Sequence, residues 1–288
     1  MQIANLNLNL PQKKEEEFLK IDFTSLFDFD FKEHKTLNFA LDLESIKDDE
    51  VYDSKLFSIA NSFDNSKRVL TISENLEKPL IIVNKLKNSE TLYTNNLLIN
   101  VKEGVKASVI EVFTSNLNNS TILANRTIEV EKKEVNYELN GLNKLRNSAN
   151  SSTLVKTTHN NQSSRSNINY KNSLLDKSRA VVKIRSIVTQ TGLYSKAFQN
   201  CNSILLSDDA VIFAQPFLEI FIDELEASHG TTTGTLNKEQ LLYLQARGIS
   251  KEKSYEMLLE AFENSIKNNI KDEKIKEFLE EYKKESFI

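Results

Sequence analysis

Two apolar runs lie close together in the middle of the chain: Ser108-Val-Ile-Glu-Val-Phe113 and Thr121-Ile-Leu-Ala-Asn-Arg-Thr-Ile-Glu-Val130. Similar runs, separated by polar stretches, occupy positions 97–101, 152–158, 166–170, 180–188, 203–206, 210–213 and 217–222. Such runs are typical of β-strands, and no helical pattern of about 10 to 15 residues intervenes between them. A βαβ sheet is therefore disfavoured over residues 91–234, and a sandwich, a barrel or a β-solenoid is favoured.

Asparagine favours the solenoid among these three folds. It is dense at residues 140–172, where we expect turns. Asparagines stacked at equivalent corners of a parallel β-helix satisfy one another in hydrogen-bonded ladders. The alternative, that the asparagine and lysine content reflects only codon bias, stays open because the repetition is too weak to give a period. We expect a mainly β protein with a parallel β-helix core at residues 91–234.

The pattern becomes helical after Thr235. Asn237, Gln240 and Gly248 predict a first helix over residues 238–247, because they match an N-cap, its capping-box partner and a C′ glycine. Ser250 and Asp272 precede two further amphipathic segments. The three apolar faces contain Leu241, Leu242, Leu244, Tyr255, Leu258, Leu259, Phe262, Ile266, Ile275, Phe278, Leu279 and Tyr282. We expect these faces to pack on the β domain and any remaining apolar surface to bind a partner.

Residues 1–90 form the third part of the predicted domain organisation, an N-terminal α/β segment with a mobile start. Phenylalanine alternates with acidic residues between Phe23 and Phe31, which suits a half-buried strand or an amphipathic linker. The pattern offers no chemistry.

The composition excludes several classes of function. The chain has only 6 glycines in 288 residues, and Gly230-Thr-Thr-Thr-Gly234 is followed by Thr235-Leu236 rather than by the Lys-Ser/Thr of a phosphate-binding loop. We therefore expect no nucleotide to be bound by this chain. The net charge is −4 and the basic residues are scattered, so no nucleic-acid partner is indicated.

The chain is expected to be cytoplasmic. No run approaches the roughly 18 to 20 apolar residues of a membrane span, and the first residues lack the layout of a secretory signal. The single cysteine, Cys201, excludes an internal disulfide framework and a multi-cysteine metal knuckle within one chain.

Cys201 and His229 are the two candidates for chemistry. Cys201 lies between asparagines in what we expect to be a polar turn before a strand, and His229 lies among small polar residues at the junction of strands and helices. The structural alternative is a buried cysteine that acts as a small apolar residue and a structural histidine. If one coil separates them, the two side chains would supply a thiolate and an imidazole, which suit iron, zinc or persulfide chemistry.

The other titratable residues are expected to be structural. We interpret His34 as solvated surface, His159 as a ladder or turn residue, and Asp208 with Asp209 as a turn. Acidic residues that alternate with apolar ones around Glu219 indicate the outer face of a strand. A β-solenoid carbohydrate-active enzyme is a remote alternative, since it needs two carboxylates at a defined separation.

Five ordered segments resemble the SufB/SufD family of iron–sulfur cluster assembly proteins. They are Leu-Leu-Ser-Asp-Asp-Ala (205–210), Pro-Phe-Leu-Glu-Ile (216–220), Ala-Ser-His-Gly-Thr-Thr-Thr-Gly (227–234), Leu-Leu-Tyr-Leu-Gln-Ala-Arg-Gly-Ile-Ser (241–250) and Met-Leu-Leu-Glu-Ala-Phe (257–262). Weaker similarity extends back to residue 95, whereas the first 90 residues are unlike the usual N-terminal region.

This resemblance implies a right-handed parallel β-helix followed by a C-terminal helical domain that docks a SufC-type ABC ATPase. Residues 227–234 look like SufD, in which the matching His229 lies at the interface with SufB and takes part in building the nascent cluster. SufB typically has an acidic residue where this chain has Gly230. Residues 198–203, Phe-x-x-Cys-x-Ser, instead resemble the SufB run whose cysteine receives sulfur and ligates the cluster, here Cys201.

The resemblance therefore implies a non-catalytic SufD-like scaffold subunit that works with the ATPase and a SufB-like paralogue, with a transient Fe–S cluster at the subunit interface. It places ATPase docking at residues 235–288, on Leu241, Leu242, Tyr243, Arg247, Gly248, Leu258 and Phe262. The alternative is a homodimeric scaffold in which Cys201 and His229 meet across a two-fold axis and themselves hold the cluster iron. Flavin use stays open.

Overall fold

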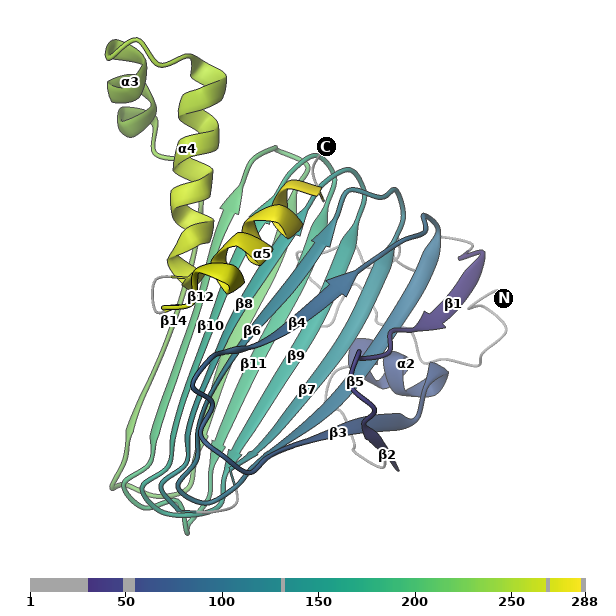
Figure 1. The fold of residues 1–288 in the computed structure, drawn as a ribbon, viewed down its shortest axis with the longest axis vertical. Coiled ribbons are helices and arrows are strands. Elements are labelled where there is room, and N and C mark those ends of the chain that lie inside the picture. The colour runs from purple at the N-terminus through teal and green to yellow at the C-terminus, as the bar shows by residue number, and fades with distance from the viewer. Residues whose placement is uncertain (1–30, 49–54, 131–132, 268–269, 286–288) are drawn as a thin grey trace.

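The computed structural model of the protein describes residues 31–48, 55–130, 133–267 and 270–285. Parallel strands wind into a β-solenoid of about six turns, and the helices lie outside it (Figure 1). The predicted mainly β fold with a parallel β-helix core is confirmed.

Each turn of the solenoid adds one strand to each of two facing sheets. The first, here called the odd sheet, contains β1 (Glu33–Thr36), β2 (Glu44–Lys47), β3 (Ser66–Ile72), β5 (Thr91–Val101), β7 (Thr121–Val130), β9 (Asn150–His159), β11 (Arg179–Val188) and β13 (Val211–Ile220). The second, the even sheet, contains β4 (Leu80–Lys85), β6 (Lys106–Ser115), β8 (Asn136–Leu145), β10 (Arg165–Leu174), β12 (Lys196–Leu205) and β14 (Glu226–Gly234). The β2 and β3 strands pair antiparallel, whereas the successive turns of the solenoid pair parallel.

The turn-to-turn spacing explains why the sequence shows no clear period. Side-chain hydrogen bonds between equivalent positions join residues that are 29, 30 or 31 apart, so the repeat length drifts along the chain. The corners repeat by conformation instead. Residues in the left-handed region recur just before successive strands, at Glu90, Gly104, Asn119, Glu134, Asn147, Ser163, Asp176 and Tyr194. Only one of these is glycine, which fits a solenoid that contains so few glycines.

The predicted asparagine ladders are present, but their members lie within the strands rather than at the corners. Inside the solenoid Asn143 donates to Asn172 at 2.7 Å. On the outer face of the even sheet Asn169 donates to Asn140 and Asn200 donates to Asn169. The strands predicted at 152–158 and 166–170 are present as parts of β9 and β10, but the expectation that the asparagines of residues 140–172 mark turns is wrong, because Asn140, Asn143, Asn169 and Asn172 lie within β8 and β10 and stack from turn to turn.

The main apolar core of the protein lies inside the solenoid, between the two sheets. Tyr170 shows how closely the turns approach, because a Cβ at Gly141 on the neighbouring strand would lie 2.2 Å from its ring. Glycine is therefore required at position 141 to admit this aromatic side chain.

Three helical caps agree with the sequence. Helix α3 (Lys238–Ala246) begins after Asn237, whose side chain accepts from the backbone N–H groups of Glu239 and Gln240. Helix α4 (Lys251–Asn264) begins after Ser250, and α5 (Glu273–Glu285) begins after Asp272. Gly248 follows α3 with φ +85°. These predictions are confirmed. They could be made from the sequence because each depends on local capping chemistry.

The helices contact the solenoid unequally. Helix α5 packs on the outer face of the even sheet, where Leu279 and Tyr282 contact the cluster of Ile110, Val112 and Leu142. Helix α2 (Lys55–Phe63) covers part of the odd sheet. Helices α3 and α4 form a hairpin that projects beyond the end of the strands (Figure 1). The expectation that the apolar face of the first C-terminal helix packs on the β domain is wrong, because α3 contains no buried residue.

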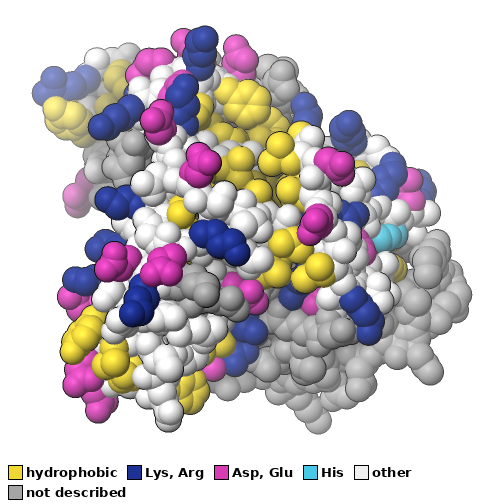
Figure 2. Space-filling view, turned by 60° about the horizontal axis from the view of Figure 1, so that its bottom comes forward, with side chains coloured by type: hydrophobic (Ala, Val, Ile, Leu, Met, Phe, Trp, Pro, Cys, Tyr) yellow, Lys and Arg dark blue, Asp and Glu magenta, His cyan; other side chains and the backbone are white. Residues whose placement is uncertain are grey.

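The surface carries mixed charge. On the face shown in Figure 2, lysine and arginine side chains alternate with aspartate and glutamate rather than forming a basic stripe.

The half-buried strand or amphipathic linker predicted between Phe23 and Phe31 lies outside the described residues, except for Phe31, which is buried.

Candidate functional site

Cys201 and His229 lie on adjacent strands at the C-terminal end of the solenoid. Strand β12 carries Cys201 and pairs in parallel with β14, which carries His229. In this register His229 is opposite Gln199, and Cys201 is opposite Thr231. Successive side chains of a strand point to opposite faces, so Gln199, Cys201 and His229 all belong to the inward-facing set. One coil brings the two candidate residues two register positions apart.

The Cys201 thiol is buried in the solenoid interior, with 0% of the residue exposed. Asn172 of β10 donates to its Sγ at 3.3 Å and to the hydroxyl of Ser203 at 3.0 Å. Burial raises the pKa of the thiol to about 11, so the cysteine is protonated near neutral pH. The predicted polar turn at Cys201 is wrong, because the residue lies in the middle of a ten-residue strand.

His229 is exposed although it belongs to the inward-facing set. The reason is its place in the last described strand: β14 and β13 end their sheets, so no further turn covers them among the described residues. Nearby on β13 and just after it, Phe217, Ile220 and Phe221 are exposed as well. An imidazole and apolar side chains thus share the open end of the solenoid.

Gln199 is a site residue that the sequence did not reveal. Its side-chain amide donates to Ser186 at 2.7 Å and to the carbonyl of Phe217 at 2.9 Å, which ties β12 to β11 and β13 across the interior. These hydrogen bonds fix the part of β12 that pairs with His229. The sequence gives no signal for such a glutamine, because its hydrogen-bond partners depend on the register of the neighbouring strands.

The other two histidines are structural. His34 contacts Thr94 at 3.0 Å and stacks on Phe63, and burial lowers its pKa, so the expectation of solvated surface is wrong. His159 lies inside the solenoid between the hydroxyls of Ser164 and Ser166, at 2.7 and 2.8 Å. It is therefore structural, as expected, but it joins the end of β9 to the start of β10 within one coil and belongs to no ladder between turns.

The carboxylates of the expected turn and strand face also have structural positions. Asp208 and Asp209 form the turn before β13. Glu219 accepts two hydrogen bonds from Arg185 on the outer face of the odd sheet. Both predictions are confirmed.

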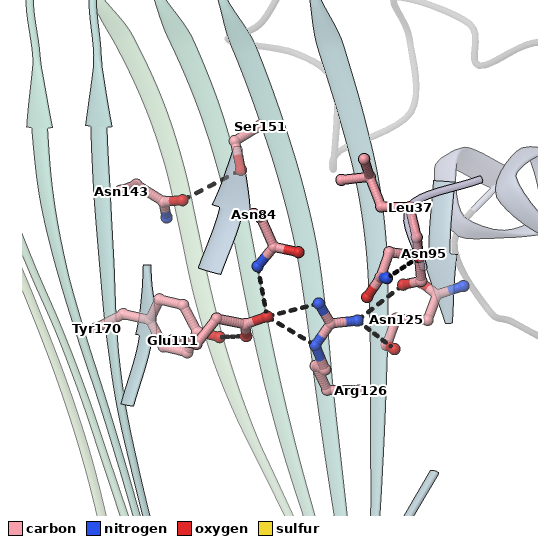
Figure 3. Close-up of polar contacts among 9 residues, drawn as sticks. All are labelled: Leu37, Asn84, Asn95, Glu111, Asn125, Arg126, Asn143, Ser151 and Tyr170. Atoms are coloured by element: carbon pink, nitrogen blue, oxygen red, sulfur yellow. Dashed lines mark hydrogen bonds and ion pairs between the residues drawn. The ribbon is translucent and has the colours of Figure 1, made fainter. Parts of the chain in front are cut away.

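A charged cluster inside the solenoid was also missed (Figure 3). The Arg126 guanidinium donates to Glu111 from Nε at 2.8 Å and from Nη2 at 2.5 Å, and Asn84 donates to the same carboxylate at 3.0 Å. The Tyr170 hydroxyl donates to the other carboxylate oxygen at 3.1 Å. In the sequence, each of these polar residues is a single exception within an apolar strand. The stacking of turns is what brings their side chains together.

The residues predicted to dock an ATPase lie on the projecting hairpin. Leu242 and Tyr243 are 65% and 57% exposed, and Arg247 lies over the Tyr243 ring at 4.7 Å. Gly248 is exposed at the turn between α3 and α4, whereas Leu258 and Phe262 are partly buried on α4. Leu241 instead lines a cavity of about 540 Å³ between the last corner of the solenoid and the hairpin, together with Tyr255 and Leu205.

Within the described residues, no group of three or more histidine, cysteine, aspartate or glutamate side chains has the arrangement of a metal site. Nor does that part of the chain contain a helix long and apolar enough to cross a membrane. Among the residues that the structure describes, Cys201 and His229 therefore do not belong to a complete metal-ligand set.

The fold and this end of the molecule define a parallel β-solenoid protein with an open terminal turn and a projecting helical hairpin. Residues 84–262, more than half of the chain, match the family described as "SUF system FeS cluster assembly, SufBD core domain". The chain belongs to this SufBD core family.

Curated relatives with similar sequences are mostly named as SufD or SufBD family proteins. The chain is 32% identical over 183 residues to the iron–sulfur cluster assembly protein SufD of Plasmodium falciparum, a match that covers 62% of this chain and 12% of that protein. It is 32% identical over 108 residues to SufD of Escherichia coli, covering 38% and 26% of the two chains. A SufBD family protein of Pyrococcus horikoshii is 32% identical over 114 residues, covering 40% and 24%. These matches span about a quarter of the relatives or less.

Proposed function

We propose that this protein is a non-catalytic, SufD-like scaffold subunit of a cytoplasmic SUF-type complex that builds and transfers iron–sulfur clusters. In this proposal it works with an ABC-type ATPase and a SufB-like paralogue. The observation that carries the proposal is the exposed imidazole of His229 on the last strand of the solenoid, at an end that the described residues leave uncovered.

The open end is suited to contact with another β-solenoid subunit. Backbone N–H and C=O groups on the outer edges of β13 and β14 have no strand partner among the described residues. Unpaired strand edges beside exposed apolar side chains such as Phe217 and Phe221 favour association with another protein. A paralogue that docks here comes close to His229.

A single imidazole cannot hold an iron–sulfur cluster, whose irons are bound mainly by cysteine thiolates with histidine as an occasional replacement. His229 therefore contributes one ligand or one proton-accepting group, and the paralogue contributes the thiolates. The cluster is the cargo of the complex and stays bound only until transfer.

The hairpin of α3 and α4 is the proposed ATPase-docking element. Two of its side chains, Leu242 and Tyr243, are large, apolar or aromatic, and exposed. None of the residues of α3 is buried, so this helix presents its side chains to a partner. The ATPase carries the nucleotide chemistry in this proposal, because the chain has no phosphate-binding loop.

Co-purification with the ATPase tests the docking part of the proposal. Leu242→Glu places a charge on the proposed docking surface and is expected to abolish co-purification. Phe278→Glu is the matched control, since Phe278 is an exposed apolar residue of α5 that the proposal leaves outside this surface. Retention of the ATPase by Leu242→Glu, or by a chain lacking residues 235–288, contradicts the proposed docking site.

A homodimeric scaffold is the second candidate, and the adjacency of β12 and β14 favours it. In a homodimer joined at the open ends, Cys201 and His229 of both copies come close to the two-fold axis. The solution mass of the purified chain separates the two proposals. A dimer that persists at low micromolar concentration supports the homodimer, whereas a monomer that associates only with a paralogue supports the SufD-like subunit.

A further inference from the structure

The cavity of about 540 Å³ between the last corner of the solenoid and the projecting hairpin is here called the hairpin cavity. The corner that joins β12 to β13 contributes Leu205 and Leu206 to its lining. The hairpin contributes Leu241 of α3 and Tyr255 of α4, and Leu236, just before α3, is a further lining residue. The volume lies in the range of roughly 300 to 1,000 Å³ that is usual for sites that bind small molecules.

Contacts outside the cavity fix the position of its walls. Leu236 is buried where the hairpin begins. Where α4 ends, the buried Glu263 carboxylate pairs with Lys144 of β8 at 3.0 Å and accepts from the Ser173 hydroxyl of β10 at 2.7 Å. Removing a buried carboxylate from its partners is strongly unfavourable. The hairpin is thus attached at both of its ends, and it cannot turn onto the solenoid corner to bury Leu241 without losing these contacts. The hairpin cavity is therefore preformed.

The walls of the cavity are mainly apolar. Four leucines and the aromatic ring of Tyr255 belong to the lining. Small-molecule sites are typically lined in this way, with a few polar groups that fix the orientation of the ligand. Contact between apolar surface and water is unfavourable, so a molecule whose apolar part displaces water from these leucines is bound favourably.

The polar groups of the lining favour an anion. The side chains of Lys238 and Tyr255 have no hydrogen-bond or ion-pair partner within the described part of the chain, and both are donors. Thr235 adds a hydroxyl group. Asp208 also lines the cavity, but it is exposed on a short side chain and keeps its carboxylate in solvent. Lysine, by contrast, carries its charge on a flexible four-carbon stem that can follow a ligand into the cavity.

We propose that the hairpin cavity binds a small molecule with an apolar body and one anionic group. The apolar body contacts the leucines and the Tyr255 ring, and the anionic group accepts hydrogen bonds from the Lys238 ammonium and the Tyr255 hydroxyl. This site is a property of the isolated chain and does not rest on the proposed scaffold function.

Calorimetric titration of decanoate into the full chain tests the proposal, because decanoate combines an apolar chain with one carboxylate. We expect saturable binding of one decanoate per chain, below the concentration at which decanoate forms micelles. Decyltrimethylammonium has the same apolar chain and the opposite charge, and we expect it to bind at least about tenfold more weakly.

Leu241→Trp is the variant that fills the cavity, and we expect it to abolish decanoate binding. The protein should tolerate this change because no residue of α3 is buried. The chain contains 0 tryptophans, so the emission of the new indole reports directly whether it is shielded from water in the cavity. Met257→Trp is the matched control, since Met257 is a 40% exposed residue of α4 outside the lining, and we expect it to bind decanoate like wild type.

Lys238→Gln tests the anionic half of the proposal without changing the apolar walls. We expect it to weaken decanoate binding about tenfold, as the loss of a hydrogen bond to a charged group does. Lys251→Gln is its control, because Lys251 is an exposed lysine at the start of α4 that does not line the cavity, and we expect wild-type affinity.

Three results would each overturn the proposal. The first is the absence of saturable decanoate binding. The second is binding that Leu241→Trp leaves unchanged, which would locate decanoate elsewhere on the chain. The third is equal affinity for decanoate and decyltrimethylammonium, or an unchanged affinity in Lys238→Gln, since the site would then not select an anion. No cluster and no ATPase enter this measurement, so its failure would leave the proposed scaffold function untouched.

Discussion

His229 lies opposite Gln199 in the parallel pairing of β14 with β12, and this register places the exposed imidazole two positions from buried Cys201. The two candidate residues lie on adjacent strands but differ in exposure to solvent. The imidazole is available to a partner, whereas the thiol is protonated and held by Asn172. In the isolated chain, therefore, His229 is exposed to a partner and the Cys201 thiol is not.

The buried thiol predicts a specific loss of stability at alkaline pH. Burial raises the Cys201 pKa from 9.0 to about 11, so the folded state disfavours the thiolate that the unfolded state adopts. The corresponding stability is present below pH 9 and is lost as the pH rises towards 11, by roughly 2 to 3 kcal/mol. Cys201→Ala removes this contribution. Urea unfolding at pH 8 and pH 10.5 is expected to show a smaller decline for the variant than for wild type, and equal declines would contradict the buried thiol.

His159 predicts an opposite effect at acid pH. Burial lowers its pKa from 6.5 to about 4, because the solenoid interior disfavours the charged form of the ring. The unfolded state binds a proton first, so stability is lost as the pH falls from about 6.5 towards 4, by about 3 kcal/mol. His159→Gln is expected to flatten the pH dependence of the urea midpoint between pH 7 and pH 4.5. An unchanged dependence would show that another group is responsible.

The Glu111–Arg126 pair predicts strong coupling in the core. Both side chains are at most 1% exposed, so Arg126→Met leaves a buried carboxylate without its counter-charge and is expected to destabilise the protein by about 3 to 5 kcal/mol. Adding Glu111→Gln is expected to recover a large part of this loss, because the uncompensated charge is then gone. Urea unfolding of the two single variants and the double variant gives the coupling free energy.

A surface pair is the matched control for this cycle. Lys196 and Glu226 bridge β12 and β14 with side chains 42% and 61% exposed, and Lys196→Met is expected to change stability by less than about 1 kcal/mol. If the double core variant lost as much stability as the two single core variants together, the coupling free energy of Glu111 and Arg126 would be zero, which would contradict the prediction.

The sequence predicted those parts of the molecule that depend on local chemistry. Short apolar runs identified most strands of the solenoid, and Asn237, Ser250 and Asp272 marked the starts of the three C-terminal helices because each caps its own helix. Strand β8 was missed because its inward-facing apolar residues alternate with asparagine and lysine.

The parts that the sequence did not predict depend on which residues stack from turn to turn. The repeat drifts between 29 and 31 residues, so the approach of Tyr170 to Glu111, 59 residues apart, is invisible before the register is known. The same uncertainty made Cys201 look like a turn residue and His34 like a solvated one. Packing of α3 failed as a prediction because an apolar helix face shows that a partner surface exists but does not identify it.

Anaerobic reconstitution with ferrous iron and sulfide tests the central claim most directly, with the ultraviolet–visible spectrum as the readout. The chain alone is expected to stay colourless, and the complex with its SufB-like paralogue and ATPase is expected to develop an iron–sulfur chromophore. His229→Ala is expected to lower that chromophore severalfold while the complex still co-purifies, since the imidazole is exposed and its removal leaves the fold intact in this account. A chromophore on the lone chain that disappears in Cys201→Ala would contradict this account and support the homodimeric scaffold.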